Sequence, residues 1–164
     1  MQAAIPPTKS DIRYRRSMQR VERTVRIAAP PAEVFGYLSD LDNLAEWQAG
    51  VTSARRTSDG DMRVGATALV TRELMGQRME APLTVTELAA PHRLGIGSEV
   101  SGVKAQATLD LVGVDDGRAT DLTFAMEIRG SMLTSFMEPM IAGAAGGDIE
   151  ASLGRLRGRF GPDA

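Results

Sequence analysis

The chain has 164 residues, of which 43% are hydrophobic and 24% are charged, and its formal net charge is −2. These proportions allow one domain with a sizeable core and exclude a disordered chain. The sequence has no cysteine and one histidine, which excludes disulfides, thiolate metal sites, a cysteine nucleophile and a multi-histidine metal site. No apolar run approaches the ~18 residues needed to span a bilayer. We therefore expect no metal, no transmembrane segment and a cytoplasmic location.

Residues 1–19 predict a basic and flexible arm, followed by a single domain over residues 20–161. Seven cations and two anions lie between Met1 and Arg26, a net charge of +5. Such an arm can contact nucleic acid or an anionic membrane, but a solvated terminus is the simpler interpretation. No hydrophobic segment leads to a small-residue cleavage site, so a secretory signal is not expected. We expect no nucleic-acid partner, with binding of the arm to a membrane or to ribosomal RNA as the least favoured hypothesis.

Apolar and polar residues alternate over 21–27, which predicts the first strand, with Arg23 as the exception on its apolar face. Two short helices are predicted next. The first begins at Pro31, because proline lacks an N–H that the first helical position would leave unbonded. The second is predicted over 43–48, with Asp40 or Asp42 as its cap.

Six further strands separated by turns are predicted from residue 51 onward. We place them near 51–57, 66–75, 78–89, 93–99, 103–113 and 119–129. In the last two of these strands, apolar residues alternate with polar ones. This pattern is typical of an antiparallel sheet with one covered face and one solvated face.

Residues 133–160 predict a long helix with two apolar stripes about half a turn apart. The first stripe holds Leu133, Met137, Met140, Ile141 and Ala144, and the second holds Ile149, Leu153, Leu156 and Phe160. Between them, residues 142–147 are all alanine or glycine, so the helix either bends or packs against two surfaces. Ser135 and Glu138 form a capping-box pattern, and Pro139 must lie in the first turns. No other element is long enough to cover the sheet, which predicts an α+β fold.

Two segments at the start of the chain resemble a known family. Residues 25–35 read VRIAAPPAEVF and residues 41–47 read LDNLAEW, and weaker matches follow at 64–65 and 90–94. The chain is similar in these features, and over 21–160, to polyketide cyclase/dehydrase-type proteins of the START/Bet v 1-like (SRPBCC) superfamily. The resemblance implies a helix-grip fold, in which a curved seven-stranded antiparallel sheet surrounds a long C-terminal helix. Members bind lipids, sterols, polyketides, quinones or hormones in the enclosed cavity, and a minority catalyse cyclisation, dehydration or hydrolysis.

The ligand-binding candidates are side chains expected on the inner face of the sheet, on the covering helix or at one end of the cavity. Small residues on the helix either bring it close to the sheet or leave space for a ligand. Methionines suit irregular apolar pockets, although ordinary gap-filling in a core is the simpler interpretation. The candidates are Trp47, Phe124, Met126, Phe136, Met137, Met140, Ile141 and Ala144.

Arg72 and Tyr37 are the weak candidates for catalysis. Arg72 shares its strand parity with apolar residues and is expected to face inward or, if the parity is wrong, to face solvent. An inward guanidinium can anchor a carboxylate or polarise a carbonyl. Tyr37 offers a hydroxyl from the first short helix, or lies at the surface. His92 follows Pro91 in a turn, where a structural or solvated histidine is the simpler interpretation.

No P-loop, dinucleotide-binding, zinc-protease or nucleophile-elbow motif occurs, and we expect no cofactor. The favoured hypothesis is a monomer or homodimer that binds a small hydrophobic or aromatic molecule, of the polyketide, lipid or quinone class. The alternative is a polyketide cyclase or dehydratase that acts on a poly-carbonyl substrate in the same cavity.

Overall fold

Seven antiparallel strands form one sheet in the order β1-β7-β6-β5-β4-β3-β2. The computed structural model describes residues 18–74, 76–100, 102–130 and 138–161, so most of the basic arm lies outside it. The strands are β1 (Met18–Ile27), β2 (Val51–Arg56), β3 (Thr67–Leu74), β4 (Gln77–Ala89), β5 (Arg93–Val100), β6 (Val103–Val114) and β7 (Ala119–Gly130). The predicted strands and the α+β class are confirmed.

Two short helical segments connect β1 to β2, as α2 (Pro31–Leu38) and then η1 (Leu41–Asn43) with α3 (Leu44–Trp47). Pro31 is the first residue of α2, as predicted. The second short helix, predicted over 43–48, is confirmed as α3 with its cap residues Asn43 and Gln48, and a 3₁₀ turn precedes it. The Asn43 N–H donates to the Asp40 carbonyl, which closes this turn, and the Asp40 carboxylate caps it by accepting from the Asp42 N–H at 3.1 Å.

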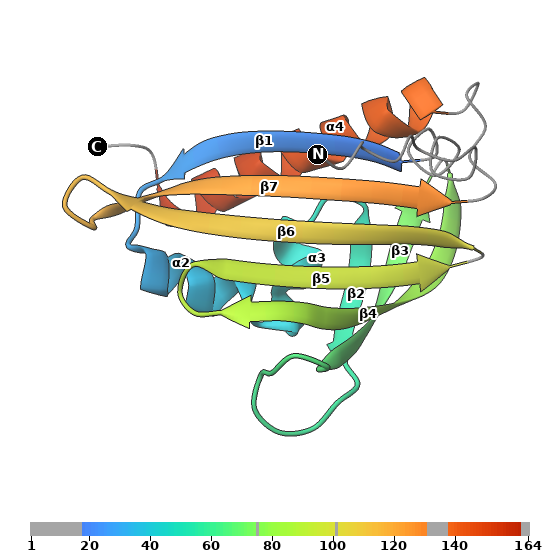
Figure 1. Ribbon diagram of the computed structural model, residues 1–164, viewed down its shortest axis with the longest axis horizontal. Helices are drawn as coiled ribbons and strands as arrows, with labels where there is room; N and C mark the ends of the chain where they lie inside the picture. Colours follow the sequence, from blue (N-terminus) through green and yellow to red (C-terminus); the bar gives the residue numbers. More distant parts are fainter. Residues whose placement is uncertain (1–17, 75, 101, 131–137, 162–164) are drawn as a thin grey trace, which may run out of the picture.

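The long helix α4 (Glu138–Phe160) lies along β1 and also contacts α3 (Figure 1). Pro139 falls in its first turn, as required. The second predicted stripe is the buried one, with Ile149, Leu153 and Leu156 in the core. The first stripe is described only at its end, where Ala144 is exposed and its neighbour Ala145 is buried.

Strict alternation of side chains builds the core on the inner face of the sheet. Irregular register in β2 and after Val85 in β4 interrupts the pairing, and bulges of this kind bend a sheet. Arg23 lies on the inner face opposite Phe124, and its guanidinium pairs with Glu150 of α4 at 3.2 Å. The strand and helix side chains buried in this core include Ile27, Val34, Leu38, Leu44, Val70, Leu83, Val85, Leu94, Leu109, Leu111, Leu122, Phe124, Ile149 and Leu156.

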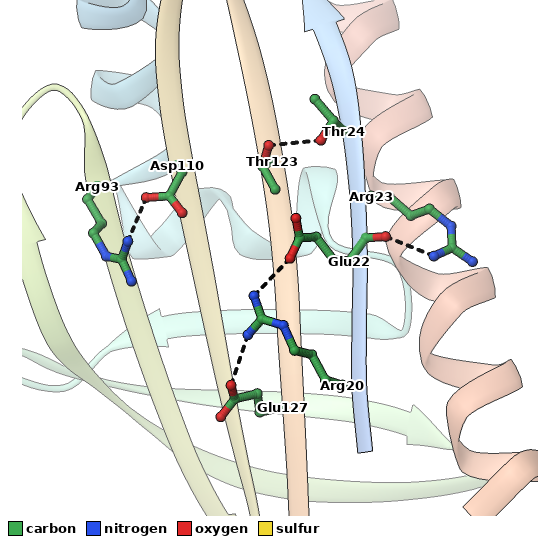
Figure 2. Close-up of polar contacts among 8 residues, drawn as sticks. All are labelled: Arg20, Glu22, Arg23, Thr24, Arg93, Asp110, Thr123 and Glu127. Carbon is green, nitrogen blue, oxygen red and sulfur yellow. Dashed lines mark hydrogen bonds and ion pairs between the residues drawn. The ribbon is translucent and has the colours of Figure 1, made fainter. Parts of the chain in front are cut away.

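The outer face of the sheet carries a network of cross-strand polar pairs (Figure 2). Arg20 of β1 pairs with Glu22 at 2.8 Å and with Glu127 of β7 at 2.9 Å. Arg93 of β5 pairs with Asp110 of β6 at 3.0 Å. These side chains are substantially solvated, so each pair contributes little to stability. The outer face is therefore the wet face of the sheet, as the alternation predicted.

Candidate functional site

A mostly apolar cavity lies between the inner face of the sheet and the end of α3. It holds about 420 Å³ of atom-free space including its opening to solvent, and about 30 Å³ of this is wide enough for the centre of a water molecule. The polar residues on its walls are Gln48, Arg72 and Ser98. The lining residues are Trp47, Gln48, Arg72, Leu83, Ile96, Ser98, Ala105, Ala107, Leu109, Phe124 and Met126.

Trp47 ends α3 and is buried, with 2% of its surface exposed. Its ring meets the Phe124 ring edge-on, with centroids 6.0 Å apart, which fixes the indole against β7. The Nε1 atom is buried and has no hydrogen-bond partner. Buried indole N–H groups usually find an acceptor, so Trp47, a lining residue, holds an unused donor.

Arg72 reaches the cavity because β3 alternates regularly. Ala66, Ala68 and Val70 are buried, and Arg72 follows with the same parity. Within the described ranges, the structure gives Arg72 neither a hydrogen bond nor an ion pair. Burial lowers the pKa of its guanidinium, and the carboxylate of Asp148 opposes that shift.

Asp148 belongs to α4 and lies beside the cavity rather than on its wall. Its Oδ2 atom is 3.5 Å from the point where a Cβ on Gly50 would lie, and Gly50 has a φ of +85°. Gly50 precedes Val51, which pairs with Arg72 across β2 and β3. Burial raises the pKa of the Asp148 carboxyl, and Arg72 opposes that rise.

Ser152, one turn beyond Asp148, anchors this part of α4. It is fully buried, donates to the Asp148 carbonyl at 2.6 Å and accepts from the Ala49 N–H at 2.9 Å. Because Ala49 lies two residues after Trp47, this contact ties α4 to the segment that carries the cavity's tryptophan and Gln48. Gln48 is 6% exposed.

The predicted site residues divide into those that meet at the cavity and those that do not. Trp47, Arg72, Phe124 and Met126 all line it. Ala144 is exposed on α4 and does not line it. Phe136 and Met137 lie outside the described residues, as do the side chains of Met140 and Ile141.

Tyr37 is placed away from the cavity, at the far end of α4. Its hydroxyl donates to Glu46 at 3.4 Å, and its ring meets Phe160 edge-on with centroids 5.8 Å apart. The guanidinium of Arg159 covers the ring at 4.1 Å. Tyr37 therefore has a full set of structural partners, and we leave it out of the candidate site. His92 is exposed, and its Nδ1 lies 3.4 Å from the Leu111 carbonyl.

Several lining residues were not predicted, although the sequence carried a signal for most of them. Inward parity on β4, β5 and β6 would have found Leu83, Ile96, Ala107 and Leu109. Gln48 carried no such signal, because it follows the last turn of α3 and its direction depends on how the chain leaves that helix.

The described residues offer no metal centre, since no group of three or more histidine, aspartate or glutamate side chains gathers in them. Among these residues there is also no helix with the length and apolar character needed to cross a membrane.

Residues 18–161 match the family described as "Polyketide cyclase / dehydrase and lipid transport". The chain belongs to this family. The resemblance seen at residues 25–47 is thereby confirmed. Two uncharacterized proteins from strains of Mycobacterium tuberculosis are each 26% identical to this family member over 145 residues, which are 88% of this chain and 100% of theirs.

Solved structures share the fold of this family member. A START superfamily protein from Mycobacterium smegmatis has a TM-score of 0.73 at 17% identity, over 86% of this chain and 96% of that one. The Zhui aromatase/cyclase from Streptomyces sp. R1128 has a TM-score of 0.72 at 15% identity, over 87% and 93%. The protein Ara h 8.0201 has a TM-score of 0.61 at 14% identity, over 85% and 97%. The helix-grip fold is confirmed by this likeness, which at such low identity extends to the fold alone.

Proposed function

We propose that this protein binds a small hydrophobic or aromatic ligand, of the polyketide, lipid or quinone class, in the cavity beside Trp47 and Arg72. The observation that carries the proposal is that two residues with unused donors line the same mostly apolar cavity: Trp47, whose buried indole N–H has no acceptor, and Arg72, which makes no hydrogen bond or ion pair within the described ranges. Apolar burial supplies affinity at about 25 cal/mol per Å². The donors would fix the direction of a ligand oxygen, as few polar groups do in most small-molecule sites.

The energetic argument concerns the cost of leaving the buried indole N–H of Trp47 unpaired. A buried donor without an acceptor destabilises a protein by about 1–3 kcal/mol. A ligand carbonyl or hydroxyl oxygen placed between Trp47 and Arg72 would remove that cost on binding. The family description names lipid transport, and one structure of the same fold is an aromatase/cyclase, which supports a ligand of this class.

The room in the cavity sets a condition on binding. A space of about 30 Å³ for water centres admits one or two water molecules. A ligand with ten or more heavy atoms therefore enters only when lining side chains move. Met126 is unbranched and adaptable, and the long side chain of Arg72 can swing, so we expect these two residues to make the space.

Trp47 is the single tryptophan of the chain and reports directly on this cavity. The test is a titration with 1,4-naphthoquinone followed by the emission of Trp47. We expect saturable quenching in the wild type and its loss in Ala107→Leu, which fills the cavity from β6. Thr84→Leu adds the same leucine to the exposed outer face of β4 and serves as the control, so quenching should persist there. Equal quenching in all three proteins would refute binding in the cavity.

The position of Arg72 favours a second candidate function, that of a polyketide cyclase or dehydratase. A guanidinium without a hydrogen bond, inside a mostly apolar cavity, can stabilise the negative charge of an enolate. Turnover of a reactive poly-carbonyl chain should fall by about 10²–10³-fold in Arg72→Met, as expected when a transition-state donor is removed. Tyr37→Phe should leave turnover unchanged. No turnover in the wild type, or equal turnover in all three proteins, would exclude catalysis by Arg72.

A further inference from the structure

We infer that Asp148 sets the charge preference of the cavity, so that the site takes a neutral ligand bearing a carbonyl or hydroxyl oxygen and rejects a carboxylate. This inference rests on the proposed function and names the chemical class of its ligand. Asp148 does not line the cavity and acts through Arg72, which does. It is therefore a residue that determines specificity without touching the ligand.

The fold places Asp148 where its charge acts on Arg72. Ser152 accepts from the Ala49 N–H and donates to the Asp148 carbonyl, which holds this turn of α4 against the segment after α3. The Asp148 carboxylate lies over Gly50, one residue before the strand partner of Arg72. A Cβ at Gly50 would stand 3.5 Å from Oδ2, an ordinary contact distance, so the carboxylate lies directly against this turn.

The two charges balance without forming a contact pair. Within the described ranges, the structure gives them neither a hydrogen bond to each other nor an approach within 4.0 Å, yet their electrostatic interaction shifts the pKa values of both groups. Arg72 is the ionised side chain among the lining residues. With Asp148 beside it, the two side chains together have a net charge of zero, and the guanidinium keeps its N–H donors available.

A ligand's charge decides whether this balance survives binding. A ketone or hydroxyl oxygen accepts from Trp47 or Arg72 and leaves the net charge at zero. A carboxylate adds a second anion next to Asp148 in a partly desolvated site, where an uncompensated charge is strongly disfavoured. A lone inward arginine would instead favour an anion. Asp148 is thus the reason that Arg72 does not make this an anion site.

The experiment compares two probes with the same ring system, 2-acetylnaphthalene and 2-naphthoate, by isothermal titration calorimetry at neutral pH. In the wild type we expect 2-acetylnaphthalene to bind at least about tenfold more tightly than 2-naphthoate. A tenfold difference in affinity is the lower end of the effect expected of one charge at close range. In Asp148→Asn we expect the ratio of the ketone's affinity to the carboxylate's affinity to fall by about tenfold, or the preference to reverse. A purely structural role for Asp148 would weaken both probes equally and leave the ratio unchanged.

Two further variants keep the test decisive. Glu150→Gln removes a neighbouring carboxylate of α4 that pairs with Arg23 rather than Arg72, so the ratio should match the wild type. Arg72→Gln keeps Asp148 and removes the cation, so it should increase the rejection of 2-naphthoate. This opposite shift tests the inference even if Asp148→Asn does not fold.

The outcomes separate this inference from the proposed function. Binding of both probes with the same ratio in the wild type, Asp148→Asn and Arg72→Gln would overturn the role of Asp148 and leave the cavity as a ligand site. Tighter binding of 2-naphthoate than of 2-acetylnaphthalene by the wild type would also overturn the role of Asp148 and leave the cavity as a ligand site. Binding of neither probe, together with no quenching by the quinone, would overturn both.

Discussion

Arg72 places a positive charge on the inner wall of the sheet without a direct partner among the described residues. The sequence left two orientations open for this residue, because a single irregularity in β3 would have turned its side chain to solvent. The strand has no irregularity in its pairing with β4, so the parity of Ala66, Ala68 and Val70 carries through to Arg72. An arginine in this position is explained better by ligand binding than by stability.

Arg72→Met should therefore stabilise the folded protein. Methionine has similar length and fills the same space without a charge that burial disfavours, so we expect the free energy of unfolding to rise modestly. Urea unfolding at neutral pH measures this change. Arg55→Met, on the exposed outer face of β2, is the control and should change stability little. A clear loss of stability in Arg72→Met alone would mean that the guanidinium is part of the structural framework.

Asp148 gives a prediction for pH dependence. Burial raises the pKa of its carboxyl above the ordinary value of 3.8, so the folded state holds this proton more tightly than the unfolded chain. The resulting stabilisation is present at pH values below 3.8 and is lost as the pH rises through the folded-state pKa. Asp148→Asn, which cannot ionise, should match the wild type near pH 3 and be more stable at about pH 7. A variant that is less stable than the wild type at neutral pH would contradict the burial argument.

At the scale of elements, α4 depends on a short polar contact as well as on its apolar stripe. The stripe of Ile149, Leu153 and Leu156 could be predicted from the sequence. The spacing of apolar residues along a helix can be recognised without knowing what the helix packs against. The contact between Ser152 and the Ala49 N–H was not visible. It joins segments far apart in the chain, and no local pattern marks a serine that faces inward.

Ser152→Ala should weaken the docking of α4 on the segment after α3. The change leaves the Ala49 N–H buried without an acceptor, so we expect a loss of about 1–3 kcal/mol in the free energy of unfolding. Thermal and urea unfolding both measure it. Ser53→Ala, at an exposed position of β2, should have little effect, and an equally small effect of Ser152→Ala would show that the hydrogen bond is not needed.

Two glycines differ in whether the structure has room for a side chain at their position. A Cβ on Gly95 in β5 would come within 2.8 Å of the Thr86 Oγ1 and 2.9 Å of the Glu87 Cβ, whereas a Cβ on Gly154 in α4 would meet nothing within 4 Å. Gly154→Ala should raise the free energy of unfolding by about 0.5–1 kcal/mol through helix propensity. Gly95→Ala should lower it. If Gly154→Ala instead lowered the free energy of unfolding, the absence of a side chain at this position of α4 would have a role.

For the whole molecule, the order of elements and the family could be predicted from the sequence, whereas the composition of the site could be predicted only in part. Strand alternation and the segments at 25–35 and 41–47 depend on local chemistry, and they led to the helix-grip fold. The cavity depends on how α3 meets the sheet, and Trp47, Phe124 and Met126 line it whereas Tyr37 does not. Its hydroxyl and ring are used by Glu46, Phe160 and Arg159, contacts that only the folded chain creates.

The central claim is that a guest molecule occupies the cavity beside Trp47 and Arg72. A crystal structure of the protein soaked with 2-acetylnaphthalene tests it most directly. We predict density for the probe between the sheet and α3, with Met126 or Arg72 displaced and the ketone oxygen within hydrogen-bond distance of the Trp47 Nε1 or the Arg72 guanidinium. An interior that stays filled by the protein's own side chains, with the probe absent or attached to the outer face of the sheet, would contradict the account.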